Sequence, residues 1–142
     1  MLRKHFTLFI LFMVTSLAAT AQTERDKAAV LAPVEQQLAA YNNRDTNAFA
    51  AAFSDTVKVY RQPGVLSYQG REELRKRYGQ MFANTPELHC EVVNRIVAGN
   101  VVIDHEKVRR SKDQLRFDAI AVYRVQHNEI VEVTFISPDK TK

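Results

Sequence analysis

Three ionisable side chains interrupt an apolar run in the second half of the chain. Residues 101–103 are all aliphatic, which is typical of a buried strand, but Asp104, His105 and Glu106 follow where further apolar residues are expected. Burying a carboxylate without a partner costs several kcal/mol, so such an interruption either faces water or serves a site. In a closed pocket, desolvation and mutual repulsion would raise at least one carboxyl pKa, and the pair could act as general acid and base.

The neighbouring strand decides what these side chains face. A four-residue turn at 111–114 sets a hairpin register in which Asp104 lies opposite Ala121 and Glu106 lies opposite Ala119. Two alanines across from two carboxylates leave room above the sheet, as a pocket floor requires. The register therefore predicts Asp104 and Glu106 as catalytic residues and both alanines as part of a ligand-binding surface.

The other face of these strands is apolar. Side chains alternate along a strand, so His105 points away from the two carboxylates, together with Ile103, Ile120 and Val122. Such a face suits packing or a dimer interface, and a homodimer is one expectation. Its apolar character also leaves open the reverse assignment, with the carboxylates on the outside.

A structural interpretation of the carboxylates competes with the catalytic one. Asp104 and Glu106 could pair with Arg95, Arg124 or another nearby base, or lie at the wet rim of a pocket. Structural ion pairs perturb pKa values as well, so the residue types alone do not separate the two interpretations.

Aromatic residues that carry one polar atom are candidates for the remaining pocket wall. Tyr41, Tyr60, Tyr78 and Tyr123 would pack like core residues and still offer a hydroxyl to a ligand. For each of them, a purely structural place in the core is the more common role. Arg61, beside a proline-glycine turn, could hold an anionic group or be an exposed arginine at a strand end.

Metal and thiol chemistry find little support in the residue pattern. His89 and His105 lie near Glu91 and Glu106 in the sequence, but their spacing matches no metal signature, so neither a metal nor another cofactor is predicted. The single cysteine, Cys90, excludes an intramolecular disulfide and is interpreted as a small buried hydrophobe.

The first 21 residues have the pattern of a secretory signal peptide. A basic start at residues 3–5 and an apolar run at 6–17 precede small residues at 19–21, which predicts cleavage near Ala21–Gln22. The apolar run is shorter than the roughly 18 to 20 residues of a membrane anchor. We therefore expect an exported protein, periplasmic or secreted, with no stable membrane insertion after cleavage.

The remaining residues, 22–142, fit one domain. The chain is 46% hydrophobic and 25% charged, as in globular proteins. Loss of Arg3 and Lys4 would leave 18 of the 20 basic side chains against 16 acidic ones, a net charge of +2. Acidic residues interleave the basic clusters, so no nucleic-acid partner is expected.

Helices come first along this domain and strands follow. Apolar spacing predicts an amphipathic helix over 25–42, with a kink or a start near Pro33, and a short second helix ending at Ser54–Asp55. A strand at 57–61, a short return strand at 65–68 and a helix from Gly70 to near Pro86 come next. Four strands follow, at 88–97, 101–110, 115–126 and 130–136. This order predicts an α+β fold with helices on one face of a curved antiparallel sheet.

Four stretches carry a family resemblance. They read AAYNNRDTNAFAAAFSDTVKVYRQPG, YQGREELRKRYGQMF, LHCEVVNRIVAGNVVIDHEKV and AIAVYRVQHNEIVEVTFI. Together they resemble the SnoaL-like branch of the nuclear transport factor 2-like superfamily, over residues 30–136. The resemblance implies a cone-shaped curved antiparallel sheet wrapped around about three helices, with a pocket in its wide end. The superfamily includes isomerases, hydrolases, cyclases, dehydratases and binding proteins, so the resemblance implies a fold more than an activity.

Two enzyme types of this superfamily lack their residues here. Ketosteroid isomerases use a tyrosine and two aspartates at places that align with Gln37, with Arg61 or Gln62, and with Ala121. Limonene epoxide hydrolases use an arginine and an aspartate on the middle strand.

The corresponding positions of the epoxide hydrolases align with Glu106 and Val108. Neither the ketosteroid isomerase reaction nor the epoxide hydrolase reaction is therefore expected.

The leading expectation is a protein that binds a small apolar molecule without turnover. The alternatives are a cofactor-free isomerase, cyclase or dehydratase using a pocket carboxylate, and a non-catalytic interaction module.

Overall fold

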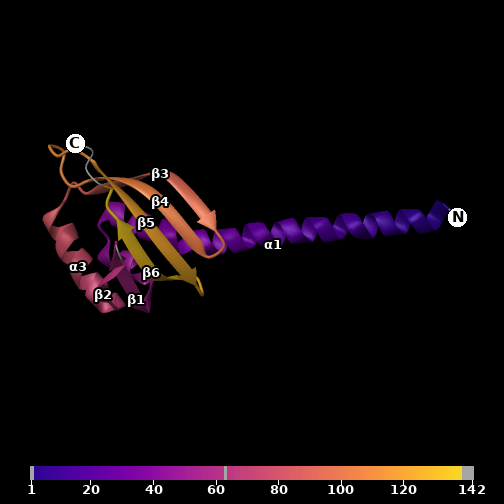
Figure 1. Cartoon of the computed structure of the whole chain (residues 1–142), viewed down its shortest axis with the longest axis horizontal. Helices are drawn as coiled ribbons and strands as arrows, with labels where there is room; N and C mark the ends of the chain where they lie inside the picture. The colour runs from indigo at the N-terminus through magenta and orange to yellow at the C-terminus, as the bar shows by residue number, and fades with distance from the viewer. Residues whose placement is uncertain (1, 63, 139–142) are drawn as a thin grey trace.

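Three helices and six strands make up the described part of the chain, residues 2–62 and 64–138 of a computed structural model, with side chains described from Thr23 onward (Figure 1). The order of the elements confirms the predicted α+β class. The elements are α1 (Leu2–Asn43), α2 (Thr46–Ala51), β1 (Phe53–Arg61), β2 (Val65–Gln69), α3 (Arg71–Asn84), β3 (His89–Ala98), β4 (Val101–Arg109), β5 (Phe117–Gln126) and β6 (Glu129–Ile136).

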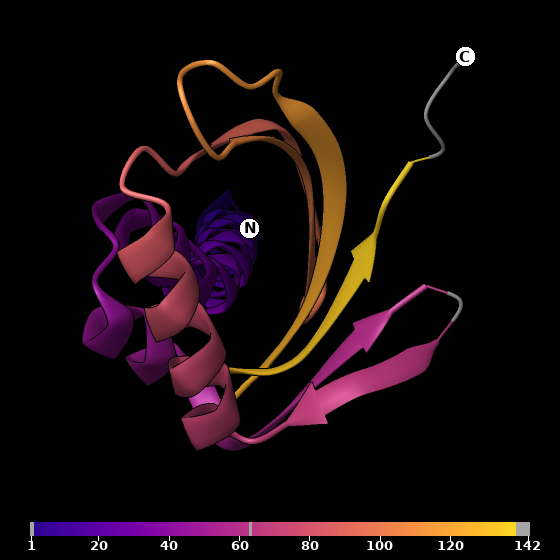
Figure 2. The ribbon, with the colours of Figure 1, turned by 90° about the vertical axis from the view of Figure 1, so that its left-hand side faces the viewer.

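One curved sheet contains all six described strands, in the order β2-β1-β6-β5-β4-β3. It arches over the helices, and Figure 2 shows α1 end-on inside the arc with α2 and α3 beside it. The strands from β3 to β6 form the predicted antiparallel meander. The sheet is not antiparallel throughout, because β1 and β6 pair in parallel. The chain between β1 and β6 contains most of the domain and is not a short hairpin turn, so the two strands can run in the same direction.

Helix α1 is much longer than predicted. It begins at Leu2 and runs through Pro33, so a helix start near Pro33 is wrong. A proline removes one backbone donor, which a long helix with a packed face can tolerate. The N-terminal part of α1 extends away from the sheet (Figure 1), and residues 23–29 are exposed. The side chains of the predicted signal peptide lie outside the described residues, and its cleavage stays a prediction.

In the described residues, we find no helix with an apolar stretch long enough to cross a membrane.

Helix α2 ends earlier than the apolar pattern suggests. Asp45 caps it by accepting a hydrogen bond from the Ala48 N–H at 2.9 Å. The predicted end at Ser54–Asp55 is wrong, because β1 already begins at Phe53. The carbonyl of Ala52 accepts the N–H of Ile130, so the chain joins β6 directly after the helix.

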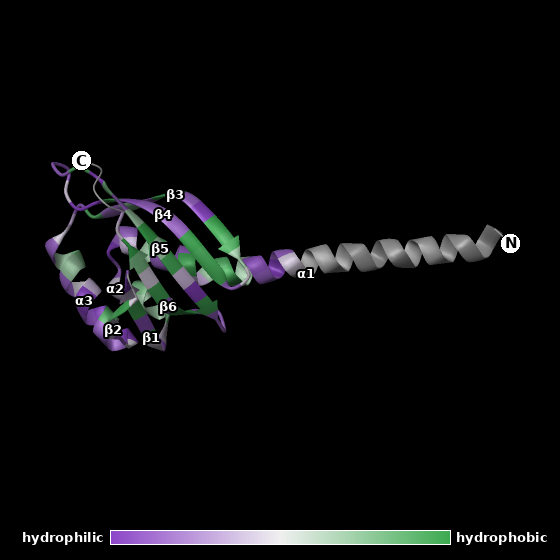
Figure 3. Cartoon of the chain, viewed as in Figure 1, coloured by the Kyte–Doolittle hydropathy of each residue, from purple (hydrophilic) through white to green (hydrophobic). Residues whose placement is uncertain are grey.

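The core lies between the helices and the concave face of the sheet. Strand residues alternate between hydrophobic and hydrophilic in bands (Figure 3), which gives the sheet one face to bury. Phe49 of α2 is buried at the centre, with its ring 4.2 Å from that of Tyr78 and 5.6 Å from that of Phe82. Burying one such aromatic contributes about 1.5–3 kcal/mol. The ring of Tyr41 on α1 joins this cluster with its centre 6.2 Å from that of Phe49, so the cluster holds α1, α2 and α3 together beside the site described next.

Candidate functional site

The predicted register between β4 and β5 is confirmed. Asp104 pairs with Ala121 and Glu106 with Ala119. Asp104 and Glu106 are buried, at 0% and 6% exposure, so they lie on the concave face and the reverse assignment is wrong. The paired segment ends at Val108, short of the predicted end of the hairpin, and the connection to β5 is correspondingly longer.

His105 lies on the opposite face, as predicted. Its Nε2 is 2.6 Å from Oδ1 of Asp118, and both side chains are partly exposed. The imidazole is therefore separated from the two buried carboxylates by the sheet itself. A homodimer through this face stays a prediction.

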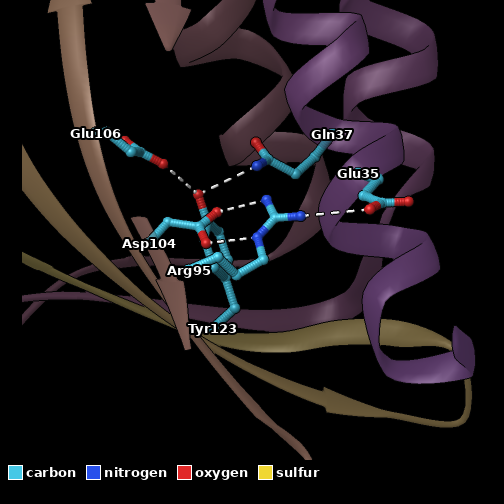
Figure 4. Close-up of polar contacts among 6 residues, drawn as sticks. All are labelled: Glu35, Gln37, Arg95, Asp104, Glu106 and Tyr123. Atoms are coloured by element: carbon cyan, nitrogen blue, oxygen red, sulfur yellow. Dashed lines mark hydrogen bonds and ion pairs between the residues drawn. The ribbon is translucent and has the colours of Figure 1, made fainter. Parts of the chain in front are cut away.

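Asp104 is committed to an ion pair. Arg95, on the adjacent strand β3, donates from Nε and Nη2 to the two carboxylate oxygens at 2.7 and 2.8 Å (Figure 4). The same guanidinium reaches Glu35 of α1 at 3.5 Å. The structural interpretation is thus confirmed for Asp104 with Arg95 as its partner, whereas Arg124 lies 3.7 Å from Glu132 instead.

Glu106 has a different set of partners. The Tyr123 hydroxyl donates to its Oε1 at 3.0 Å, and the Gln37 side-chain amide donates to the Tyr123 oxygen at 3.1 Å (Figure 4). Burial, together with the charge of Asp104, raises the pKa of Glu106 to about 7, against the lowering effects of hydrogen bonds from Tyr123 and Cys90 and of the charge of Arg95. The carboxyl is therefore present in both protonation states at neutral pH.

A cavity of about 180 Å³ opens beside Glu106. Gln37 and Tyr123 also line it, so the whole hydrogen-bonded chain borders the open space. Aliphatic and aromatic residues from α1, α3 and the sheet complete most of the wall. They include Leu38, Met81, Val108, Phe117, Ala119 and Phe135.

The structure brings some predicted ligand-binding residues together and not others. Tyr41, Arg61, Ala119 and Tyr123 line the cavity, as does the further candidate Tyr78. Tyr60 lies on β1 and Ala121 is fully buried, and neither belongs to the described lining.

Gln37 is a site residue that the sequence analysis noted only as a replaced tyrosine. Its signal was its place on α1, where a polar side chain falls between Val34 and Tyr41 on the apolar stripe. A polar residue on a buried stripe calls for a partner, and here the partner is Tyr123. The two residues are far apart in the sequence, so a local sequence pattern cannot predict that they pair.

A second hollow of about 330 Å³ adjoins the first. The two share Arg61, Tyr78, Met81 and Phe135 in their linings. Its remaining wall comes from β1, β2 and α3, so the open space follows the sheet from β4 toward its β2 edge.

Cys90 faces the same cavity as Glu106. It is buried and free, and burial raises the pKa of its thiol, with a further rise from the charge of Glu106. A thiol with a raised pKa is a poor nucleophile at neutral pH, which agrees with the interpretation of Cys90 as a small buried hydrophobe. Across the described residues, no group of three or more metal-ligating side chains is gathered in one place.

Comparison with solved structures places the fold. A cystatin fold protein from Novosphingobium aromaticivorans, described as uncharacterized, is 26% identical with a TM-score of 0.68, over 75% of this chain and 97% of that one. An LEH-like epoxide hydrolase from M. tuberculosis is 16% identical with a TM-score of 0.65, over 78% of this chain and 84% of that one.

A SnoaL-like protein of unknown function from Burkholderia thailandensis is 15% identical with a TM-score of 0.66, over 78% of this chain and 95% of that one. At identities this low, the second and third structures show the shared fold alone. No curated protein matches the chain. The SnoaL-like domain model matches residues 34–133, which confirms the predicted resemblance, and the chain belongs to the SnoaL-like domain family.

Proposed function

We propose that the protein binds a small, mostly apolar molecule in the cavity and that Glu106 moves a proton to or from it without a cofactor. One observation carries the proposal: Glu106 is a buried carboxyl on the cavity wall with a pKa raised to about 7. A general acid or base works best when its pKa lies near the operating pH. The reaction class is that of isomerases, cyclases and dehydratases.

The neighbours of Glu106 suit this task. As a carboxylate, Glu106 accepts hydrogen bonds from the Tyr123 hydroxyl and the Cys90 thiol. Its two oxygens together offer about four lone-pair positions, so it can still accept a proton from the bound molecule. Gln37 fixes the Tyr123 oxygen from the other side, so the carboxyl has one defined orientation. A positioned general base of this kind contributes about 10²- to 10⁴-fold in rate.

For Asp104 we propose an indirect part in place of direct proton transfer. Its two oxygens are held by Arg95, and it does not belong to the cavity lining described above. Its charge nevertheless favours the protonated form of Glu106. Asp104 would therefore help to set the protonation state of Glu106 from two residues away on the same strand.

Export is proposed alongside this activity. The basic, apolar and small-residue pattern of residues 1–21 supports cleavage before Gln22. The mass of the protein isolated from its natural host tests this. A chain that begins at Gln22 is expected, and an intact chain beginning at Met1 would contradict export by this route.

The function is tested in two steps. Native mass spectrometry of the protein from its natural host, followed by extraction, identifies a bound molecule. That molecule is then incubated in D₂O with the wild type, with Glu106→Gln and with the control Glu132→Gln, whose side chain is partly exposed beside Arg124. We expect product or deuterium incorporation with the wild type and the control, and a loss of at least about 100-fold with Glu106→Gln.

Each other outcome has a defined meaning. Undiminished turnover by Glu106→Gln overturns the role of Glu106. A recurring bound molecule that none of the three proteins alters points to binding without a reaction. If no bound molecule is found in the protein from its natural host, the result favours a non-catalytic interaction module instead.

A further inference from the structure

Two arginines stand on the cavity wall without an acidic partner. Arg61 ends β1 and Arg110 directly follows β4, so they reach the cavity from different parts of the sheet. Neither makes an ion pair with any described residue, whereas Arg71 and Arg95 each hold carboxylates in the same domain. Arg110 does lie over the Phe117 ring, at 5.4 Å from its centre. That contact leaves the charge unneutralised.

The described lining contains one acidic side chain, that of Glu106. The lining thus carries two guanidinium groups, both on exposed residues, against at most one negative charge, and this balance favours an anionic guest. A guanidinium presents donors in a planar fork that matches a carboxylate, which makes Arg the residue type suited to holding one.

The cavity beside Glu106 limits the size of the part of the guest that lies in it. A dry cavity of about 150 Å³ in an engineered protein holds one benzene molecule. At about 180 Å³, this cavity has room for a body of about one ring, and the adjoining hollow of about 330 Å³, which shares Arg61, has room for any extension of the guest. Its wall of Leu38, Met81, Val108 and Phe135 suits an apolar body, and Glu106 offers a polar contact to it.

We infer that the natural ligand is a small carboxylate with an apolar body of about one ring, whose carboxylate is held by Arg61 and Arg110 while the body lies toward Glu106. The inference rests on the proposed function, because it names the class of molecule on which Glu106 would act. It extends that proposal from an apolar molecule to an amphipathic anion.

The test compares two probes that share one body. Binding of 3-phenylpropionate and of 3-phenylpropan-1-ol is titrated against the wild type, Arg61→Gln, Arg110→Gln and the control Arg124→Gln. Arg124 is an arginine on β5 that pairs with Glu132 outside the cavity lining. We expect the acid to bind the wild type at least tenfold more tightly than the alcohol. Either cavity variant should lose about tenfold for the acid alone, and Arg124→Gln should match the wild type.

Three results would overturn the inference: equal binding of acid and alcohol, no detectable binding of the acid, or the same loss in the control variant. Titration of Glu106→Gln keeps this test apart from the proposed function. If Glu106→Gln still prefers the acid but retains turnover of the natural ligand, the anion site stands and the proton-transfer role fails. If Glu106→Gln loses turnover and neither the wild type nor any variant prefers the acid, the proton-transfer role stands and the anion site fails.

Discussion

Two carboxyl groups on one face of β4 have very different partners. Asp104 is bound through both oxygens to a guanidinium, and Glu106 contacts the neutral hydroxyl of Tyr123. A neutral donor compensates only part of the cost of burying a charge, so desolvation governs the pKa of Glu106. This difference is why Glu106 is proposed to exchange the proton, although both residues share a face and a strand.

Replacing Glu106 with glutamine should change how stability depends on pH. The pKa of Glu106 is raised from 4.5 to about 7 in the folded protein, so the folded state keeps its proton where the unfolded chain has lost it. The resulting stabilisation is complete below about pH 4.5 and is lost as the pH rises through about 7, by about 3 kcal/mol at most. Glutamine does not titrate. Urea denaturation at pH 5 and pH 8 should show Glu106→Gln gaining about 1–3 kcal/mol on the wild type at the higher pH.

The control for this experiment is Glu132→Gln, a substitution of a partly exposed carboxylate. Its stability should follow the wild type at both pH values within about 0.5 kcal/mol. Parallel pH profiles for wild type and Glu106→Gln would mean that Glu106 has an ordinary pKa, and the proposed proton transfer would lose its basis.

Between elements, Arg95 ties three parts of the fold together. It lies on β3, holds Asp104 of β4 through both oxygens and reaches Glu35 of α1. Arg95→Met would leave the fully buried Asp104 without its cation, and breaking a buried pair in this way costs about 3–5 kcal/mol. Urea denaturation near pH 7 measures the loss.

The double variant Arg95→Met/Asp104→Asn should recover part of that stability, since no buried charge is then left unpaired. Arg124→Met, at a partly exposed pair, should cost less than about 1 kcal/mol. Equal losses for Arg95→Met and Arg124→Met would contradict the special cost of the buried pair.

Asn42 joins the end of α1 to the start of β3. Its side-chain amide donates to the Cys90 carbonyl at 2.9 Å and its oxygen accepts the Cys90 N–H at 2.7 Å. Asn42→Ala removes both bonds and should cost about 1–3 kcal/mol in denaturant. Asn42→Asp keeps only the acceptor oxygen, so its stability should lie between that of the wild type and that of Asn42→Ala. If Asn42→Ala is as stable as the wild type, water replaces both hydrogen bonds and this prediction is wrong.

Contacts between residues close in the sequence could be predicted at this site, and contacts between distant residues could not. The pairing of Asp104 with Ala121 could be predicted because a short connection and alternating side chains define a hairpin locally. The start of β1 at Phe53 could not, because it depends on pairing with Ile130, far along the chain. Gln37 was missed for the same reason, since its partner Tyr123 lies on the fifth strand. Arg95 was one of two named candidates, and only the observed pairing of strands chose it over Arg124.

For the molecule as a whole, the first described side chains of α1 lie outside the core. Residues 23–29 are exposed, and the described contacts with the core begin near Val30. A chain that begins at Gln22 should therefore unfold at the same urea concentration as the chain that begins at Met1, within about 0.5 kcal/mol. A loss of more than about 1 kcal/mol would mean that the first 21 residues belong to the folded domain.

The position of β6 determines when the sheet can form. This strand ends the described sheet in sequence, yet it lies between β1 and β5 and is paired with both. During synthesis, the β1–β2 hairpin and the β3–β5 meander emerge first and have no bridge between them. The cavity wall formed by Arg61 and by Phe135 of β6 cannot exist at that stage. Completion of the sheet therefore waits until β6 has been made, because among the described strands β6 alone pairs with both β1 and β5.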